Sequence, residues 1–210
     1  MRIIFATGNE DKIREIRRIL GGISAPVYSL KEIGLTSEAE ENGATFEENA
    51  LIKAQEIWDK LKASGELKYT MVMADDSGLC IDHMGGQPGV QSARFMGHDT
   101  GYDIKNQAIL DAMKDVPDEE RGAAFVCSIA AISERGRVYK TRGEMRGRIA
   151  HEIAGNGGFG YDPIFYLPEY GCTSAELTED QKNEISHRGQ AVRAMKELLL
   201  FHQYLFEKRP

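Results

Sequence analysis

Hydrophobic positions along the chain follow two different periods in turn, which predicts strands alternating with helices. Residues 2–6 form a short apolar run, typical of a buried strand, and apolar side chains then recur at helical spacing over residues 13–20. A second helix is expected after Thr45, because Thr45 and Glu48 have the spacing of a capping box. The chain therefore begins with a strand, a polar turn and a helix, as α/β proteins commonly do.

The same two periods continue along the rest of the chain. A strand is expected at residues 70–74, and it ends in the polar segment Asp75-Asp76-Ser77-Gly78. A hairpin of two strands is expected at residues 123–133 and 138–144. The other expected elements are a helix at 104–113, a glycine-rich loop at 155–160, a strand at 163–166, a helix capped by Thr178 and Gln181, and a helix at about 190–206. This order predicts an α/β fold with a mixed sheet. Residues 1–210 are long enough for one large domain or for a single domain of two lobes, and length alone does not choose between them.

Composition and charge narrow the class of partner. Of the 210 residues, 41% are apolar, which is enough for a substantial core. The net charge of −7 provides no basic field for phosphate backbones, so a nucleic-acid polymer is not expected as the main partner. The three cysteines form no CxxC pair, and no apolar run approaches the roughly 20 residues of a membrane helix. These features favour a reduced, cytoplasmic protein without a membrane partner.

The turn that follows the first strand is a candidate anion site. Unpaired backbone N–H groups and the positive end of the helix dipole attract anions at such a turn. Lys12 in the first helical turn opposes that dipole, and a phosphate between them would convert the repulsion into attraction. The alternative is an ordinary capped turn with a solvated lysine. The candidate residues are Thr7, Gly8, Asn9, Glu10, Asp11 and Lys12.

Acidic residues provide a candidate cation site. Asp75 and Asp76 follow the expected strand, at the sheet edge where α/β proteins place ligands. Because consecutive side chains on a strand diverge, one carboxylate is expected to be functional and the other structural. A hard cation such as Mg²⁺ needs only one or two carboxylates, and one of Glu38, Glu40 and Glu41 is a candidate second ligand. A turn or helix cap for the aspartates and a solvated surface for the glutamates are the alternatives.

Two further segments are candidates for contact with a ligand. Phe159 and Tyr161 stand among glycines in 157–162, where an aromatic ring can stack on a nucleobase. His187 and Arg188 precede the last helix and can donate hydrogen bonds to an acceptor-rich ligand. A hydrophobic plug under the loop and an ordinary polar surface are the respective alternatives. The histidines lack metal-ligand spacing and no GxSxG elbow is present, which argues against zinc hydrolysis and acyl transfer.

Taken in order, these segments resemble the non-canonical purine nucleoside triphosphate pyrophosphatase family, also called the inosine triphosphate pyrophosphatase family. The matching blocks span nearly the whole chain. They are Ala6-Thr7-Gly8-Asn9 with Lys12, FEENA at 46–50 with Lys53, ADDSG at 74–78, 85–89 leading into Ser92-Ala93-Arg94, GGFGYDPIF at 157–165, Ala175-Glu176-Leu177, and Ser186-His187-Arg188.

The resemblance implies an elongated α/β fold with a long mixed sheet, two lobes around a central substrate cleft, and a homodimer. It also implies Mg²⁺-dependent cleavage of ITP, dITP and XTP between the α- and β-phosphates, which gives a nucleoside monophosphate and pyrophosphate. The cellular role would be to cleanse the nucleotide pool of deaminated purines.

The resemblance also implies roles for individual residues. Asp76 would be the catalytic proton acceptor and would bind the metal together with Glu41. Donors on His187 or Arg188 would pair with the 6-keto oxygen of the base and reject the 6-amino group of adenine. The residues implied to contact substrate are Thr7, Gly8, Asn9, Glu10, Asp11, Lys12, Lys53, Ser77, Phe159, Gly160, Tyr161, Asp162, Lys182, His187 and Arg188, with Arg94 as a further candidate.

Two other functions stay open from the sequence. A related house-cleaning enzyme would use the same residues on modified pyrimidine triphosphates, and a panel of nucleotides with identified products would reveal it. A non-catalytic nucleotide-binding module would show the same low background turnover after Asp76→Asn, with binding retained.

Overall fold

The computed structural model describes the backbone of residues 1–207 and the side chains of residues 1–200. Its strands are β1 (Arg2–Phe5), β2 (Val27–Ser29), β3 (Thr70–Ile81), β4 (Gly122–Ser133), β5 (Val138–Ile149), β6 (Phe165–Leu167) and β7 (Cys172–Thr173). The α-helices within the described residues are α1 (Glu10–Ile19), α2 (Phe46–Ser64), α3 (Tyr102–Ala112), α4 (Glu179–Ile185) and α5 (His187–Glu207).

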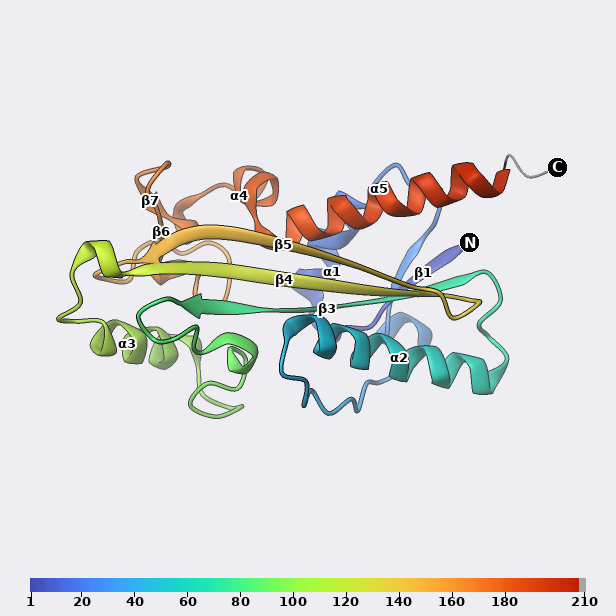
Figure 1. Cartoon of the computed structure of the whole chain (residues 1–210), viewed down its shortest axis with the longest axis horizontal. Helices are drawn as coiled ribbons and strands as arrows, with labels where there is room; N and C mark the ends of the chain where they lie inside the picture. Colours follow the sequence, from blue (N-terminus) through green and yellow to red (C-terminus); the bar gives the residue numbers. More distant parts are fainter. Residues whose placement is uncertain (208–210) are drawn as a thin grey trace. The chain divides into compact units, whose positions relative to one another are not determined.

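The strands form one mixed sheet in the order β2-β1-β3-β4-β5-β6-β7. Figure 1 shows the long strands β3, β4 and β5 running beside one another. β1 pairs in parallel with both β2 and β3, whereas β6 pairs antiparallel with β5 and with β7. The predicted α/β class with a mixed sheet is therefore confirmed.

The chain folds into two compact units. Within the described residues, the first comprises Met1–Asp76, Cys127–Gly143 and residues 188–207, and the second comprises Ser77–Val126 and Glu144–His187. The boundary thus falls inside β3, directly after Asp76.

In the first unit, the apolar side chains of the central strands alternate between two cores. On β3, Met71 and Met73 belong to the core formed with α1 and α5, whereas Val72 and Ala74 belong to the core formed with α2. Successive side chains of a strand point to opposite faces of the sheet. Asp75, the next residue after Ala74, is therefore directed to the side of α1 and α5. Asp76 is directed to the side of α2.

Side-chain caps fix where two helices begin, as the sequence predicts. At α2, the Thr45 hydroxyl accepts a hydrogen bond from the Glu48 N–H while the Glu48 carboxylate accepts one from the Thr45 N–H. Thr178 and Gln181 form the same reciprocal arrangement at α4. Each arrangement satisfies two backbone donors that the first helical turn would otherwise leave unpaired.

The second unit is held together around a buried arginine. Arg121 is 1% exposed, and its guanidinium donates to the carbonyl oxygens of Met113, Val116, Ile149 and Ala150. The first two carbonyls lie at and just beyond the C-terminal end of α3, where helical carbonyls lack partners along the helix. Arg121 therefore ties the end of α3 to the end of β5.

The expected end of a strand at residue 74 is wrong, because β3 continues to Ile81. Asp75 and Asp76 consequently lie in the middle of a strand and not at the edge of the sheet. The sequence suggested that Gly78 belongs to a turn. In the structure, Gly78 lies within β3 and packs closely against Gly89 and Ser92. A Cβ added there would come within 2.4 Å of both the Gly89 carbonyl oxygen and the Ser92 hydroxyl.

Other boundaries differ by a few residues from those expected. α3 begins at Tyr102 and α5 at His187, each somewhat earlier than the sequence pattern indicated. The strand expected at 163–166 is a 3-10 turn over Asp162–Ile164 followed by β6. Proline at the second position of this turn lacks the N–H that a strand ladder uses.

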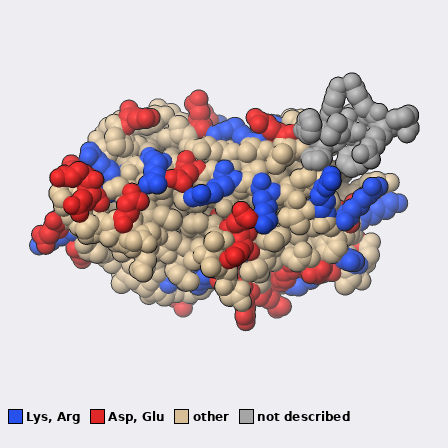
Figure 2. Space-filling view, viewed as in Figure 1, with Lys and Arg blue, Asp and Glu red and all other residues tan. Residues whose placement is uncertain are grey.

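On the face drawn in Figure 2, acidic and basic side chains are interspersed. Among the described residues, no helix has both the length and the apolar content that crossing a membrane requires.

Candidate functional site

Adjacent carboxylates on β3 have separate sets of partners. Asp75 accepts from the Lys12 ammonium of α1, at 3.1 Å to Oδ1 and 2.9 Å to Oδ2, and lies 3.4 Å from Nε of Arg188 in α5. Asp76 accepts from two side chains of α2, the Asn49 amide at 3.1 Å and the Lys53 ammonium at 3.3 Å. The divergence expected of consecutive strand residues is confirmed, and it follows the alternation of the two cores.

Asp75 is almost completely buried, and two cations, Lys12 and Arg188, lie beside its carboxylate. Burial alone would raise the pKa of Asp75, but the charges of Lys12, Arg188 and Lys53 outweigh it and hold that pKa well below its usual range. Arg188, 4% exposed, also pairs with Glu15 of α1 at 2.6 Å. Asp75 therefore remains ionised and joins α1, β3 and α5 through charge-assisted hydrogen bonds.

Asp76 has the opposite electrostatic character. Burial raises the pKa of Asp76, the Lys53 ammonium lowers it, and repulsion from Glu41 and Asp75 raises it further, so the net direction is upward. Lys53 also binds Glu41, at 3.1 Å. Burial lowers the pKa of Lys53, but the surrounding carboxylates reverse this and raise it. On the α2 side of β3, the Lys53 ammonium thus lies between the carboxylates of Asp76 and Glu41.

This group of residues fits a divalent cation. Glu41 and Asp76 offer hard carboxylate oxygens, and both already contact one cation, Lys53. Across the side chains that the structure describes, no set of three or more His, Cys, Asp or Glu residues converges as a metal cage. Mg²⁺ suits such a site, because it is commonly bound by one or two carboxylates and keeps water or phosphate oxygens as its other ligands.

The loop before α1 is a capped turn whose lysine is not solvated. Oδ1 of Asn9 accepts from the N–H groups of Asp11 at 2.9 Å and Lys12 at 3.1 Å, and Thr7 Oγ1 accepts from the Asn9 N–H at 3.2 Å. The side chains of Glu10 and Asp11 pair with surface cations. A Cβ added at Gly8 would meet nothing within 4 Å, so the backbone there is open to a ligand.

In the second unit, Asp162 organises the glycine-rich loop. Its carboxylate accepts from the Lys182 ammonium at 2.5 Å, the Phe159 N–H at 2.8 Å and the Ser174 hydroxyl at 2.9 Å. The Lys182 ammonium also lies 5.0 Å from the centre of the half-buried Phe159 ring. Gly158 has a φ of 69°, and a Cβ there would lie 2.2 Å from the carboxylate of Asp162. Asp162 and Lys182 therefore stabilise the loop that presents Phe159.

Tyr161 anchors the same glycine-rich loop through a buried side chain. It is 3% exposed, donates from its hydroxyl to the Ser92 carbonyl at 2.7 Å, and packs edge-on against Tyr102 with 5.2 Å between ring centres. Burial raises the pKa of Tyr161. The Gly160 carbonyl accepts from the Asn106 amide at 3.1 Å. Tyr161 is therefore a hydrophobic plug under the loop, which was the alternative to stacking on a nucleobase. Phe159 is only half-buried.

The remaining predicted residues have mixed environments. His187 is 7% exposed and its ring stacks on Phe125 of β4, with 5.0 Å between centres and 14° between planes. Ser77 is half-buried on β3. Neither His187 nor Arg188 is an ordinary polar surface residue, which excludes that alternative for both.

Three residues that the sequence analysis did not single out belong to these groups. Glu15 pairs with Arg188, Asn49 with Asp76, and Ser174 with Asp162. Asn49 carried a usable signal. It directly precedes Ala50, which lies at helical spacing from Phe46 and Ala54, and a polar residue beside such a buried apolar face needs a polar partner. Glu15 and Ser174 gave no comparable signal in the sequence.

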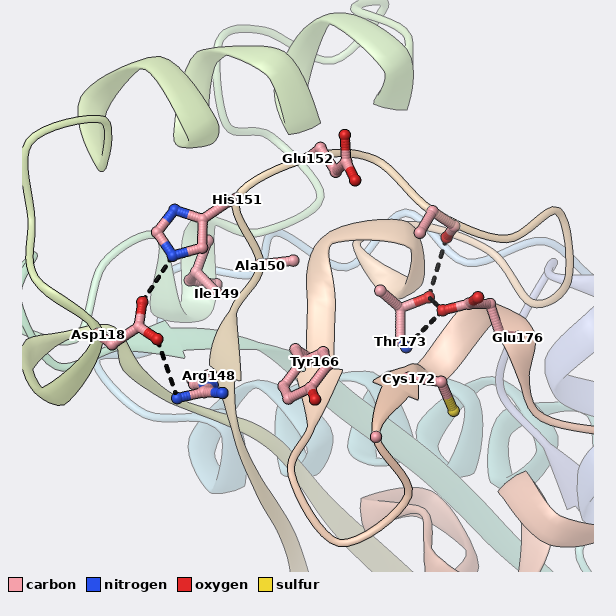
Figure 3. Close-up of a pocket in the computed structure, with 12 residues that line it drawn as sticks. Asp118, Arg148, Ile149, Ala150, His151, Glu152, Tyr166, Cys172, Thr173 and Glu176 are labelled. Carbon is pink, nitrogen blue, oxygen red and sulfur yellow. Dashed lines mark hydrogen bonds and ion pairs between the residues drawn. The ribbon is translucent and has the colours of Figure 1, made fainter.

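A pocket of about 260 Å³ lies elsewhere in the second unit (Figure 3). Asp118 lies at one side of it, 2.6 Å from His151 Nε2 and 3.5 Å from Arg148, whose guanidinium stacks on Tyr166. Cys172 also lines it. None of the predicted site residues contributes to this pocket, so the candidate site is defined by its polar contacts and not by this cavity.

Comparison with known proteins finds relatives over nearly the whole chain. The model of the Ham1 family matches residues 3–198. A dITP/XTP pyrophosphatase of Clostridium perfringens is 43% identical over 198 residues, which cover 94% of this chain and 97% of that protein. A solved HAM1 protein from Coxiella burnetii superimposes with a TM-score of 0.84 at 36% identity, covering 95% of this chain and 98% of that one. A solved dITP/XTP pyrophosphatase from Mycobacterium abscessus gives a TM-score of 0.72 at 39% identity, covering 93% and 98%.

Proposed function

Since the chain belongs to the Ham1 family, we propose that it is a nucleoside triphosphate pyrophosphohydrolase acting on non-canonical purine nucleotides. The family that the motifs predicted is thereby confirmed. The proposed substrates are ITP, dITP and XTP, and the products are a nucleoside monophosphate and pyrophosphate. The observation that carries the proposal is the buried Asp76 carboxylate, which shares the Lys53 ammonium with Glu41.

In the proposed reaction, Asp76 accepts a proton from the attacking water. The water oxygen forms a bond to the α-phosphorus while the bond to the α,β-bridging oxygen breaks, and pyrophosphate leaves with that electron pair. Asp76 already contacts the Lys53 ammonium, and a bound cation would keep its carboxylate ionised and able to accept a proton near neutral pH. Asn49 and Lys53 hold its carboxylate, so the base is oriented before substrate arrives.

Asp76 and Glu41 would hold a Mg²⁺ ion. When bound, the ion would neutralise charge on the phosphates. Lys53, which contacts both carboxylates, is a further proposed cation for the phosphates.

Lys12 and the open backbone at Gly8 are the proposed anchors of the phosphate chain. An ammonium has three N–H donors, so Lys12 can retain Asp75 and still donate to a phosphate oxygen. Because Asp75 already holds the ammonium in place, little side-chain entropy remains to be lost when the substrate binds.

Phe159, His187 and Arg188 are the proposed contacts to the base. Phe159 offers a ring face for stacking, on a loop held by Asp162 and Lys182. His187 and Arg188 are the proposed donors to the 6-keto oxygen of hypoxanthine or xanthine. Adenine presents a 6-amino donor at that position and would leave these buried donors unpaired.

The decisive experiment incubates the protein and Mg²⁺ with ITP, XTP, dITP, ATP and GTP, and identifies the products by chromatography. The proposal predicts monophosphate and pyrophosphate from the first three and much slower turnover of ATP. Release of orthophosphate, or equal rates for ATP and ITP, would contradict it. Modified pyrimidine triphosphates in the same panel test the related enzyme class. Assembly as a homodimer and location in the cytoplasm stay predictions, which chromatography with light scattering and cell fractionation would test.

A further inference from the structure

A buried amide connects the Asp76 carboxylate with the backbone of the segment that follows Glu41. Asn49 of α2 is 0% exposed. Its Nδ2 donates to Oδ2 of Asp76 at 3.1 Å, and its Oδ1 accepts from the Gly43 N–H at 2.8 Å. These two partners fix the orientation of the amide, since a carboxylate can only accept and an N–H can only donate. Asn49 thus uses both ends of its side chain.

The Gly43 end of this bridge controls the segment that carries Glu41. The N–H of Ala44 donates to the Glu48 carboxylate at 2.7 Å, so consecutive backbone donors after Glu41 are tied to the first turns of α2. The approach is close. A Cβ added at Gly43 would lie 2.8 Å from Oδ1 of Asn49 and 2.7 Å from Cβ of Glu48. Glycine is therefore needed at 43 for the contact to form.

At the other end of the bridge, the Asn49 amide occupies one of the two oxygens of the Asp76 carboxylate. Oδ2 faces Asn49, while Oδ1 faces the Lys53 ammonium that Glu41 also contacts. An aspartate at position 49 would provide no donor, and a leucine would provide neither donor nor acceptor. Glutamine is one methylene longer and would not fit a fully buried site without displacing its neighbours.

We propose that Asn49 is a positioning residue whose amide sets the separation between the Asp76 and Glu41 carboxylates that receive the divalent cation. The inference rests on the proposed function, because it takes these two carboxylates as the metal ligands. Partners of metal ligands generally change metal affinity or activity by 10- to 100-fold when they are removed, since they orient the ligand atoms.

The test measures Mn²⁺ binding to the nucleotide-free protein by calorimetry or by electron paramagnetic resonance, together with kcat, KM and the melting temperature. Asn49→Ala is expected to weaken Mn²⁺ binding by about 10- to 100-fold. Gly43→Ala disturbs the other end of the bridge, together with the contact to Glu48, and is also expected to weaken Mn²⁺ binding. Asn106→Ala removes an equally buried amide from the second unit and is the control, with unchanged Mn²⁺ affinity expected.

A double variant separates positioning from general stability. If Asn49 acts through Asp76, the effect of Asn49→Ala on Mn²⁺ affinity shrinks when Asp76 is already Asn, because the two changes share one interaction. Wild-type Mn²⁺ affinity in Asn49→Ala, with only a lowered melting temperature, would overturn the proposal. Should Asn49→Ala fail to fold, Gly43→Ala decides on the same criterion. Full pyrophosphate release by Asp76→Asn would instead reject the proposed function, independently of the metal affinities.

Discussion

The Lys12 ammonium of α1 lies 2.9 Å from Oδ2 of Asp75 in β3, and their side chains are only 17% and 1% exposed. This pairing means that the proposed phosphate-binding lysine is held from behind by a carboxylate that stays ionised. The Lys12 ammonium therefore has a structural partner, Asp75, and a proposed ligand, the phosphate. Variants of Lys12 or Asp75 are expected to affect stability and phosphate binding together.

Lys12→Met is expected to raise KM for all triphosphates by a similar factor. Hydrogen bonds to charged groups contribute about 1.5–3 kcal/mol, which corresponds to roughly 10- to 150-fold in affinity. The ratio of kcat/KM between ITP and ATP should stay constant, because phosphates are common to both. Steady-state kinetics measure this. Lys31→Met is the matched control, since Lys31 is 83% exposed and pairs only weakly with Glu10 at 3.4 Å. A changed ITP-to-ATP ratio in Lys12→Met would contradict the assignment.

Asp75→Asn is expected to flatten the acid limb of the stability curve. The folded pKa of Asp75 is depressed, so its contribution to stability is present above the unfolded value of about 3.9 and is lost as pH falls below it toward the folded pKa. The wild-type protein should therefore lose stability more steeply below about pH 4 than the variant. Urea denaturation at a series of pH values from 3 to 6 measures the difference. Parallel curves for the two proteins would mean that Lys12 and Arg188 do not stabilise the ionised carboxylate.

Arg188→Lys is expected to reduce discrimination between ITP and ATP by about tenfold or more, because a lysine keeps the charge but loses the planar set of donors. The variant should also lose stability, since Arg188 joins Asp75 and Glu15. Glu15→Gln separates the two effects. It removes one partner of Arg188 and leaves the guanidinium present, so stability should fall while discrimination is largely kept. Unchanged discrimination in Arg188→Lys would remove Arg188 from the base site.

Gly158→Ala is expected to raise KM by disturbing the loop that presents Phe159. The left-handed backbone conformation alone costs an alanine about 1–2 kcal/mol, and the new Cβ would also collide with Asp162. Gly171→Ala is a matched control within the second unit. Gly171 has a similar φ of 67°, but nothing lies within 4 Å of an added Cβ. Both variants should melt at lower temperature, and only Gly158→Ala should change KM. Equal KM values would show that the loop does not contact the nucleotide.

Local patterns predicted the helices well because their signals lie within a few residues. The capping boxes at Thr45 and Thr178 each depend on a partner three positions away, and both form. The ordered motifs predicted the family for the same reason, since each block is short and is read directly from the sequence.

The sequence did not predict that β3 continues through two aspartates, because the groups that permit it are distant along the chain. Lys12 and Arg188 are 63 and 113 positions from Asp75, and Lys53 is 23 positions from Asp76. A local reading of Asp-Asp-Ser-Gly favours a turn, whereas the folded chain supplies each carboxylate with a cation. The role of Asp162 was hidden similarly, since its partners Lys182 and Ser174 come from later segments.

The alternation of side chains along β3 also constrains how this protein can change during evolution. A one-residue insertion or deletion between Thr70 and Asp75 would exchange the faces of every following side chain, and each acid would then meet the other's partners. Inserting two residues preserves the faces but shifts the acids along the sheet. Substitutions at single positions can therefore accumulate in this strand, whereas length changes before the aspartates should be eliminated. Among natural variants of the chain, the spacing between Thr70 and Asp76 is expected to be constant even where the residues between them differ.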